Sequence, residues 1–259
     1  MEPVHISSRK NPALRAAAEL KSSAEARKSA GAFIAEGARL VEDAAKSGMR
    51  ISSLFYTAEA YEKYRLYIDA ALRVCREAYT LEPHAAALLA TTKSSQGVYA
   101  VCEIPRGEKE IQGKIIVLEN IQDPSNMGTM LRTAEAMGIG CAVLSGCCCD
   151  VYSPKVLRGS MGAVFRLNLK HFGEPAQACR SLREMGYKVY GSVPLESALK
   201  INEVSFDEHS AVVIGNEGNG MTEASKKLCH GLITIPMKGR AESLNAATAA
   251  ALVMWEMTK

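Results

Sequence analysis

The second half of the chain alternates short apolar runs, rich in β-branched residues, with segments of helical pattern. The runs are KIIVLEN (114–120), CAVLSG (141–146), VFRLNL (164–169), KVYGSV (188–193), SAVVIGN (210–216) and LITIPM (232–237). Helical segments begin near Asn126, Pro154, Pro175, Thr222 and Ser243. Strands that alternate with helices predict an α/β fold with a parallel sheet covered on both faces. Ligands of such sheets bind beyond the carboxyl ends of the strands, so the loops after Asn120, Asn216 and Met237 form the candidate site.

The first hundred residues have a different pattern. They predict a Lys/Arg/Ala-rich helix over 9–30, a short apolar run at 33–37, a helix through Ala45, a strand at 51–56, a helix over 82–90 and a strand at 94–104. Five aromatic residues lie irregularly between Phe55 and Tyr67, an arrangement that suits core packing better than base stacking. The charged, Gly-containing segment 105–114 indicates a linker. We therefore expect two domains, residues 1–108 and 109–259.

Composition excludes several classes of protein. Of 259 residues, 47% are hydrophobic and 23% charged, which is typical of a globular chain and not of a disordered one. The formal net charge of +3 does not by itself indicate a nucleic-acid binder, although a local patch can still bind one. The start MEPVHISSRK lacks the apolar region of a signal peptide, and the eight cysteines include no C-x-x-C pair. We expect a soluble cytoplasmic protein without a metal site or membrane span.

The first candidate loop runs from Asn120 through Asp123-Pro124 into a helix that ends near Gly138. Ser125 or Asn126 is a suitable N-cap for this helix. Arg132 lies about one and a half turns further along. Its guanidinium either points towards the cleft or lies on an exposed helix face.

The other two loops carry small residues and few charges. The second, Ile214–Met221, contains Gly215, Gly218, Gly220 and one carboxylate, Glu217. It matches neither G-x-G-x-x-G nor a P-loop, which argues against a dinucleotide-dependent oxidoreductase. The third, 235–245, leads into an Ala-rich helix with Ser243 as the predicted N-cap, and that helix suits a tight dimer or a crowded cleft. Backbone amides near Ile235 and Leu244 can hold an adenine-like ring.

These three segments, in this order, resemble the signature motifs of the SpoU/TrmH family of RNA ribose 2′-O-methyltransferases, within the SPOUT superfamily. The resemblance spans residues 112–259 and includes DVYSPKVLRGSMG (150–162). Residues 4–105 resemble the family's substrate-binding domain, of ribosomal-protein-like α/β architecture, through N-P-x-L-R and F-I-A-E-G-x-R-L.

The resemblance implies a C-terminal trefoil knot, S-adenosyl-L-methionine as cofactor and a homodimer. It places the cofactor on Gly215, Ile235 and Leu244, with Gly191 and Pro236 nearby. It assigns functional polar roles to Asn126, Arg132, Glu217, Ser243 and Asn245. All have the expected residue type, which argues against a non-catalytic RNA-binding or ribosome-assembly factor of the same fold.

The implied reaction must deprotonate a ribose 2′-hydroxyl, a weak acid. Arginine effectively never loses its proton. We therefore expect Arg132 to clamp the adjacent phosphate, and to act as a base only if phosphate contact and desolvation permit it. Glu217 has three candidate roles: contact with a partner subunit, orientation of Asn126 or Arg132, and general base. We favour orientation.

The expected partner is RNA. Ribosomal RNA of the large subunit is favoured over tRNA, and a tRNA ribose methyltransferase is the alternative within the family. The candidate RNA contacts of the first domain are Arg9, Lys10, Arg15, Lys21, Arg27 and Lys28, unless these line a merely solvated helix. Arg158 is a further candidate for a phosphate contact. Deletion of residues 1–105 is expected to abolish activity on structured RNA and leave cofactor binding intact.

Overall fold

The computed structural model describes residues 2–107 and 110–259, and these form two compact units. The first unit contains the described residues up to Gly107 together with Asp150–Phe165, and the second contains the rest. The predicted domain boundary, between residues 108 and 109, lies outside the described residues. The structure differs from the predicted division in one respect, because Asp150–Phe165 packs in the first unit.

Five described strands form the sheet of the first unit, in the order β1-β4-β3-β5-β2. They are β1 (Val4–Ile6), β2 (Ala32–Glu36), β3 (Ile51–Thr57), β4 (Glu77–Leu81) and β5 (Val98–Glu103). Strand β5 is antiparallel to both of its neighbours, and the other pairs are parallel. Strands β1 and β4 were not predicted, since β1 is only three residues long and the EAYTL of β4 shows no regular alternation.

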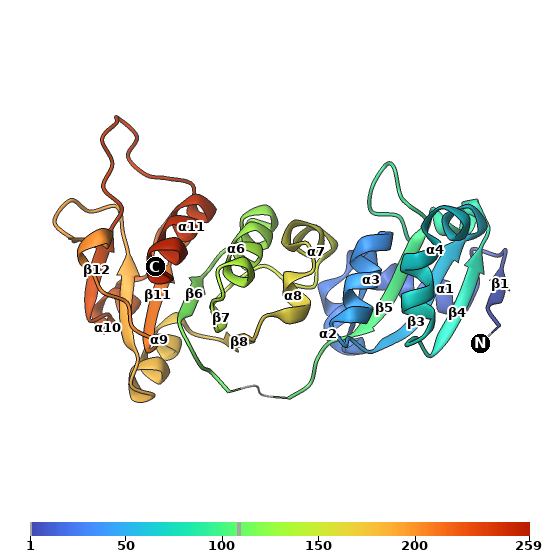
Figure 1. Cartoon of the computed structure of the whole chain (residues 1–259), viewed down its shortest axis with the longest axis horizontal. Coiled ribbons are helices and arrows are strands. Elements are labelled where there is room, and N and C mark those ends of the chain that lie inside the picture. The colour runs from blue at the N-terminus through green and yellow to red at the C-terminus, as the bar shows by residue number, and fades with distance from the viewer. Residues whose placement is uncertain (1, 108–109) are drawn as a thin grey trace. The chain divides into compact units, whose positions relative to one another are not determined.

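Helices cover both faces of this sheet (Figure 1). Helices α1 (Pro12–Ser22) and α5 (Pro83–Ala86) share a buried core with Phe55 and Tyr99. Helices α3 (Ala38–Lys46) and α4 (Ala58–Leu72) pack against each other on the other face. The single helix predicted over 9–30 is wrong: it is divided at Ser23, whose side chain caps α2 (Ala24–Ala30). Helix α4 was not predicted, because its aromatic and charged residues follow no clear period.

The second unit has seven parallel strands within its described part, in the order β10-β12-β9-β11-β6-β7-β8. They are β6 (Ile115–Glu119), β7 (Cys141–Ser145), β8 (Leu169–Phe172), β9 (Lys188–Ser192), β10 (Leu199–Lys200), β11 (Ser210–Ile214) and β12 (Gly231–Thr234). The predicted strand over 164–169 is wrong. Most of it lies in α8 (Ala163–Arg166) and the turn that follows, because Val164 and Phe165 are buried as helical residues of the first unit.

Two pairs of helices enclose the parallel sheet. Helices α9 (Pro175–Glu184) and α10 (Glu223–Leu228) lie on one face, where Ala178, Cys179 and Leu182 pack on strand residues. Helices α6 (Pro124–Ala136) and α11 (Ala246–Met257) lie side by side on the other face (Figure 1). This arrangement confirms the predicted α/β fold with a parallel sheet covered on both faces. No helix in the described part of the chain has the length and apolarity needed to cross a membrane.

The cysteines behave mainly as small apolar residues. All eight are free thiols, and Cys75, Cys102, Cys141 and Cys179 are buried. Burial raises the pKa of Cys102 and of Cys141 to about 12, so neither thiol ionises near neutral pH. Cys147, by contrast, is exposed two residues after the end of β7.

Candidate active site

A cavity of about 380 Å³ lies at the carboxyl ends of the central strands of the second unit. Its walls come from four segments that are far apart in sequence: 192–195 after β9, 214–221 after β11, 234–237 after β12, and residues near the start of α11. Parallel strands bring these loops to one edge of the sheet. The cavity therefore lies where the strand pattern predicts a ligand site.

The Gly-rich wall of the cavity is a tight backbone crossing. Asn216 and Gly220 exchange two backbone hydrogen bonds of 3.0 and 2.9 Å, and the Asn216 Oδ1 accepts from the backbone N–H groups of Gly218 and Asn219. A Cβ on Gly215 would lie 2.3 Å from the Gly220 carbonyl carbon. Gly215 is thus required by its own loop, which holds the cavity wall in shape.

The expected cofactor residues occupy two kinds of position. Gly215, Ile235 and Leu244 line the cavity. Gly191 and Pro236 do not: Gly191 is buried, and a Cβ there would lie 2.8 Å from the Met221 Cε. Gly191 therefore supports the cavity indirectly, by allowing Met221 to pack on β9.

A chain of side-chain amides joins the three candidate loops. Asn245 Nδ2 donates to Asn126 Oδ1 at 3.1 Å, and Asn126 Nδ2 donates to Glu217 Oε1 at 3.0 Å. Glu217 also accepts a 3.3 Å bond from the backbone N–H of Asp123 and another from Asn216 Nδ2. Glu217 thus fixes the orientation of Asn126, and Asn126 fixes that of Asn245. The orienting role of Glu217 in the reaction stays a prediction, and these bonds supply the contacts that it requires.

The helix caps differ from those predicted. Asp123, not Ser125 or Asn126, caps α6, because its Oδ1 accepts from the N–H groups of Ser125 and Asn126 at 2.7 and 2.9 Å. Asn245, not Ser243, caps α11 through bonds of 2.9 and 3.2 Å to Oδ1. Both helices start where a side-chain oxygen reaches back over the first turn. Asn126 is consequently released from capping and can bind Glu217.

Ser243 and Arg132 have few internal contacts. Ser243 is exposed and lines the same cavity as Glu217. Arg132 is exposed on α6, in the same helix as Asn126, and no described residue forms a hydrogen bond or ion pair with it. The structure therefore brings Asn126, Glu217 and Asn245 into direct contact, and it leaves the Arg132 guanidinium available to a ligand.

Three further polar residues shape the site, and the sequence analysis gave none of them a role of its own. The buried Glu119 accepts a 2.7 Å bond from the backbone N–H of Thr222, directly after the Gly-rich loop. Asn216 Nδ2 donates to the Asn120 carbonyl at 2.8 Å. Asn120 itself has a φ of 55°, in the left-handed region. The sequence shows a carboxylate followed by asparagine at the end of an otherwise apolar strand, a pattern that a solvated strand end shares.

In the first unit, the expected RNA-contact residues are partly engaged elsewhere. Arg9, Lys10, Arg15 and Lys28 are exposed. Two expectations are wrong, because Lys21 donates to the carbonyls of Leu88 and Ala90, and Arg27 is buried in an ion pair with Asp150. The spacing of basic residues along a helix does not show which of them form hydrogen bonds or ion pairs within the same unit.

Residues 113–255 match the SpoU rRNA methylase family. The chain belongs to this family. Residues 11–100 of this SpoU-family chain match the MRM3-like substrate-binding domain. The 23S rRNA (guanosine(2553)-2′-O)-methyltransferase RlmP of Bacillus subtilis is 31% identical over 218 residues, which cover 84% of this chain and 85% of RlmP. These matches confirm the family resemblance seen in the sequence.

Solved structures agree with this family membership. The SpoU methyltransferase AviRb from Streptomyces viridochromogenes, in complex with AdoMet, has a TM-score of 0.82 and 26% identity, covering 96% of this chain and 97% of AviRb. An AdoMet-bound rRNA methyltransferase from Sinorhizobium meliloti has a TM-score of 0.86 at 24% identity, covering 98% of this chain and 96% of that one. The second likeness shows the fold alone.

Proposed function

We propose that this SpoU-family enzyme transfers a methyl group from S-adenosylmethionine to a ribose 2′-hydroxyl of structured RNA, with large-subunit ribosomal RNA as the substrate. The observation that carries the proposal is the hydrogen-bonded series Asn245–Asn126–Glu217, next to a ligand-sized cavity. The similarity to RlmP extends over 84% of the chain, and RlmP methylates a ribose of 23S rRNA. That breadth supports ribosomal RNA over tRNA.

The cavity has the chemistry that S-adenosylmethionine requires. Its volume of about 380 Å³ lies in the ordinary range for small-molecule sites, roughly 300–1,000 Å³. Val193, Ile235 and Leu244 supply apolar walls for an adenine ring, and the adjacent backbone supplies polar groups. The Glu217 carboxylate in the lining suits a cationic sulfonium. Bound there, the cofactor supplies a methyl group already activated by positive charge.

The protein must position the ribose, assist loss of its proton and exclude water. Asn126 and Asn245 each use one N–H within the amide series and keep a second N–H for the ribose or cofactor. Arg132 holds the neighbouring phosphate through two parallel N–H bonds and lowers the pKa of the hydroxyl by its charge. Ser243, exposed at the cavity, contributes a hydroxyl to the same polar surface.

The remaining parts of the proposal concern assembly and substrate delivery. Residues 1–108 present RNA through the exposed Arg9, Lys10 and Arg15, and residues 109–259 carry the methyltransferase site. The chain works in the cytoplasm as a homodimer with a trefoil knot at the cofactor site. The exposure of Leu252 and Trp255 on α11, beside the residues of α11 that line the cavity, supports such a dimer.

The decisive test incubates the protein with labelled S-adenosylmethionine and unmodified pools of rRNA or tRNA, and then maps 2′-O-methyl groups by resistance to alkaline cleavage. We expect incorporation into 23S rRNA, absent with the Asn126→Ala variant. Incorporation into tRNA alone would replace the proposed substrate. No incorporation into either pool would favour a non-catalytic RNA-binding factor.

A further inference from the structure

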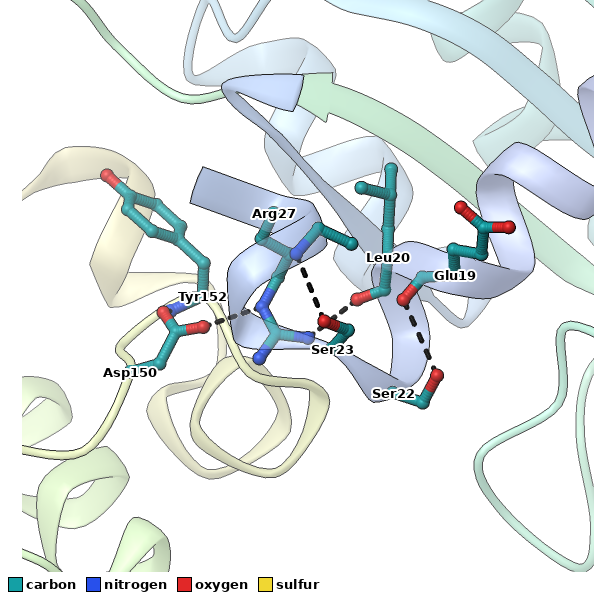
Figure 2. A network of polar contacts seen from close by, with 8 residues as sticks. Glu19, Leu20, Ser22, Ser23, Arg27, Asp150 and Tyr152 are labelled. Atoms are coloured by element: carbon teal, nitrogen blue, oxygen red, sulfur yellow. Dashed lines mark hydrogen bonds and ion pairs between the residues drawn. The ribbon is translucent and has the colours of Figure 1, made fainter. Parts of the chain in front are cut away.

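One segment of the methyltransferase sequence is built into the first unit. Asp150–Phe165 lies inside the matched methylase region 113–255, yet it packs with residues up to Gly107. Figure 2 shows the contact that fastens it: the Arg27 Nε donates to Asp150 Oδ2 at 2.6 Å, and Arg27 Nη1 donates to the Leu20 carbonyl at 2.6 Å. Only 6% of the Arg27 side chain is exposed. A buried guanidinium with both contacts in place is costly to separate from its carboxylate.

Apolar contacts reinforce this ion pair. The Tyr152 ring stacks on Phe33 at a centroid distance of 4.8 Å, and Phe165 stacks on Phe33 at 5.9 Å. Burial raises the pKa of Tyr152 to about 12, so its hydroxyl stays neutral beside Asp150. Val156 and Leu157 of α7 (Pro154–Ser160) are also buried. The segment therefore has a defined position on β2.

This position sets Arg158 of α7 into a cavity of about 580 Å³ with residues of α3 and of the loop before β5. We name it the α3–α7 cavity; Arg39, Gln96 and Arg158 are among its lining residues. Arg158 Nη1 donates to the Thr91 hydroxyl, which leaves its other donors for a ligand. Gln96 Oε1 accepts from the backbone N–H of Ala38 at 2.8 Å, so its amide NH₂ is also a candidate donor.

The carboxylates of the α3–α7 cavity already have partners. Glu36 accepts from Thr91 and Thr92, and Glu42 is paired with Lys46 at 2.8 Å. Asp43 is also engaged. Arg39, by contrast, is exposed and has no hydrogen bond or ion pair with any described residue. Within the described lining, the guanidinium groups of Arg39 and Arg158 therefore keep N–H donors for an anion, whereas the carboxylate oxygens are already used in hydrogen bonds or an ion pair.

We propose that the α3–α7 cavity binds a backbone phosphate of the RNA substrate between Arg39 and Arg158, and that Arg27 and Asp150 are positioning residues that hold Arg158 there. The inference rests on the proposed function, because it takes RNA as the substrate. Guanidinium groups bind phosphate through two parallel N–H bonds, which an ammonium group cannot supply. The RNA contact then depends on a segment of the methylase region as well as on the first hundred residues.

The phosphate contact is tested by the salt dependence of binding to in-vitro-transcribed 23S rRNA. Arg39→Gln and Arg158→Gln should each weaken RNA binding about tenfold. Each should also reduce the slope of log K, the binding constant, against log salt concentration by about 0.7–0.9, which corresponds to the loss of one phosphate contact. The control is Arg73→Gln, at the exposed C-cap of α4. Unchanged affinity and slope in both cavity variants would overturn the proposal.

The positioning role is tested with Asp150→Asn, which keeps the shape of the side chain and removes its charge. We expect KM for RNA to rise several-fold with kcat and S-adenosylmethionine affinity unchanged, and we expect Arg27→Lys to retain more RNA affinity than Arg27→Gln. Thermal unfolding measured in parallel separates folding from positioning. A lowered Tm with an unchanged KM for RNA, measured below that Tm, would refute the positioning role.

Two further outcomes distinguish this inference from its alternatives. If the cavity variants lost binding to polyglutamate but kept RNA binding, the cavity would serve an acidic protein partner and the RNA proposal would fail. If wild-type protein bound rRNA with the predicted slopes but transferred no methyl group, the proposed function would fail and the phosphate site would stand.

Discussion

At the scale of single residues, the environment of Glu217 favours positioning over proton abstraction. Its carboxylate accepts bonds from the side-chain amides of Asn126 and Asn216, and these contacts connect two loops. Glu217→Gln keeps an oxygen acceptor for Asn126. We therefore expect kcat to fall about tenfold with an unchanged pH profile. A general base typically contributes 10²- to 10⁴-fold, so a larger loss together with a changed acidic limb would identify Glu217 as the base.

Arg132 gives a second prediction at this scale. Its guanidinium is exposed and has no partner among the described residues, which suits a ligand contact. Lysine preserves the charge but not the paired N–H geometry. Arg132→Lys should therefore lower kcat about 100-fold and leave S-adenosylmethionine affinity unchanged, as measured by single-turnover kinetics and calorimetry. Arg180→Lys, on α9, is the control. Near-normal turnover by Arg132→Lys would refute the phosphate clamp.

At the scale of elements, α11 combines a helix cap with a site residue. Asn245 Oδ1 caps the helix and Nδ2 donates to Asn126, so the two roles belong to different atoms. Aspartate caps as well as asparagine but cannot donate from that position. Asn245→Asp should keep the free energy of unfolding within about 0.5 kcal/mol and lower kcat, whereas Asn245→Ala should lose about 1 kcal/mol as well. Equal kcat in wild type and Asn245→Asp would show that capping is the sole role.

The elements also show how far the sequence can be interpreted. Strands β6, β7 and β11 are completely buried, β9 and β12 are partly buried, and the sequence predicted each of the five. The failures have physical causes. Val164 and Phe165 have β-branched and aromatic character, but they are buried in the first unit as helical residues. The predicted helix cap was wrong because several side chains that can cap a helix lie close together in the sequence. Only the path of the backbone decides between Asp123, Ser125 and Asn126.

The candidate site was likewise predicted only in part. The strand pattern placed the three loops at one edge of the sheet, and the family resemblance singled out Asn126, Glu217 and Asn245, which are joined by hydrogen bonds. The pattern did not reveal Glu119, because a carboxylate at the end of a buried strand is indistinguishable in sequence from a solvated strand end. It also did not show that Arg27 is buried, since the partner Asp150 lies 123 positions away. Contacts over such separations depend on tertiary packing.

At the scale of the whole molecule, we expect the proposed dimer to depend on α11. Leu252 is 43% exposed and Trp255 is 54% exposed, three residues apart on one side of the helix. Apolar exposure of this kind favours a second copy of the chain. Trp255→Glu should convert the proposed dimer to monomer and weaken S-adenosylmethionine binding, as measured by analytical ultracentrifugation and calorimetry. Leu66→Glu, on the more exposed Leu66 of α4, is the control. A wild-type monomer would remove this part of the proposal.

The division into two units changes what a truncation should do. The sequence suggested that removing residues 1–105 would leave cofactor binding intact. However, the truncated chain would keep Asp150–Phe165 and lose Arg27 and Phe33, to which that segment is attached. Each buried apolar side chain left exposed forfeits roughly 1.5–3 kcal/mol. We therefore expect the truncated chain to aggregate or to unfold at a lower temperature than the full chain.

The matched control adds Tyr152→Ser, Leu157→Ser and Phe165→Ser to the same truncation, and it should recover solubility and cofactor binding. If the simple truncation were monodisperse and bound S-adenosylmethionine with wild-type affinity, the prediction would be wrong. The segment would then not need the first unit, because the remaining chain would bind the cofactor without residues 1–105.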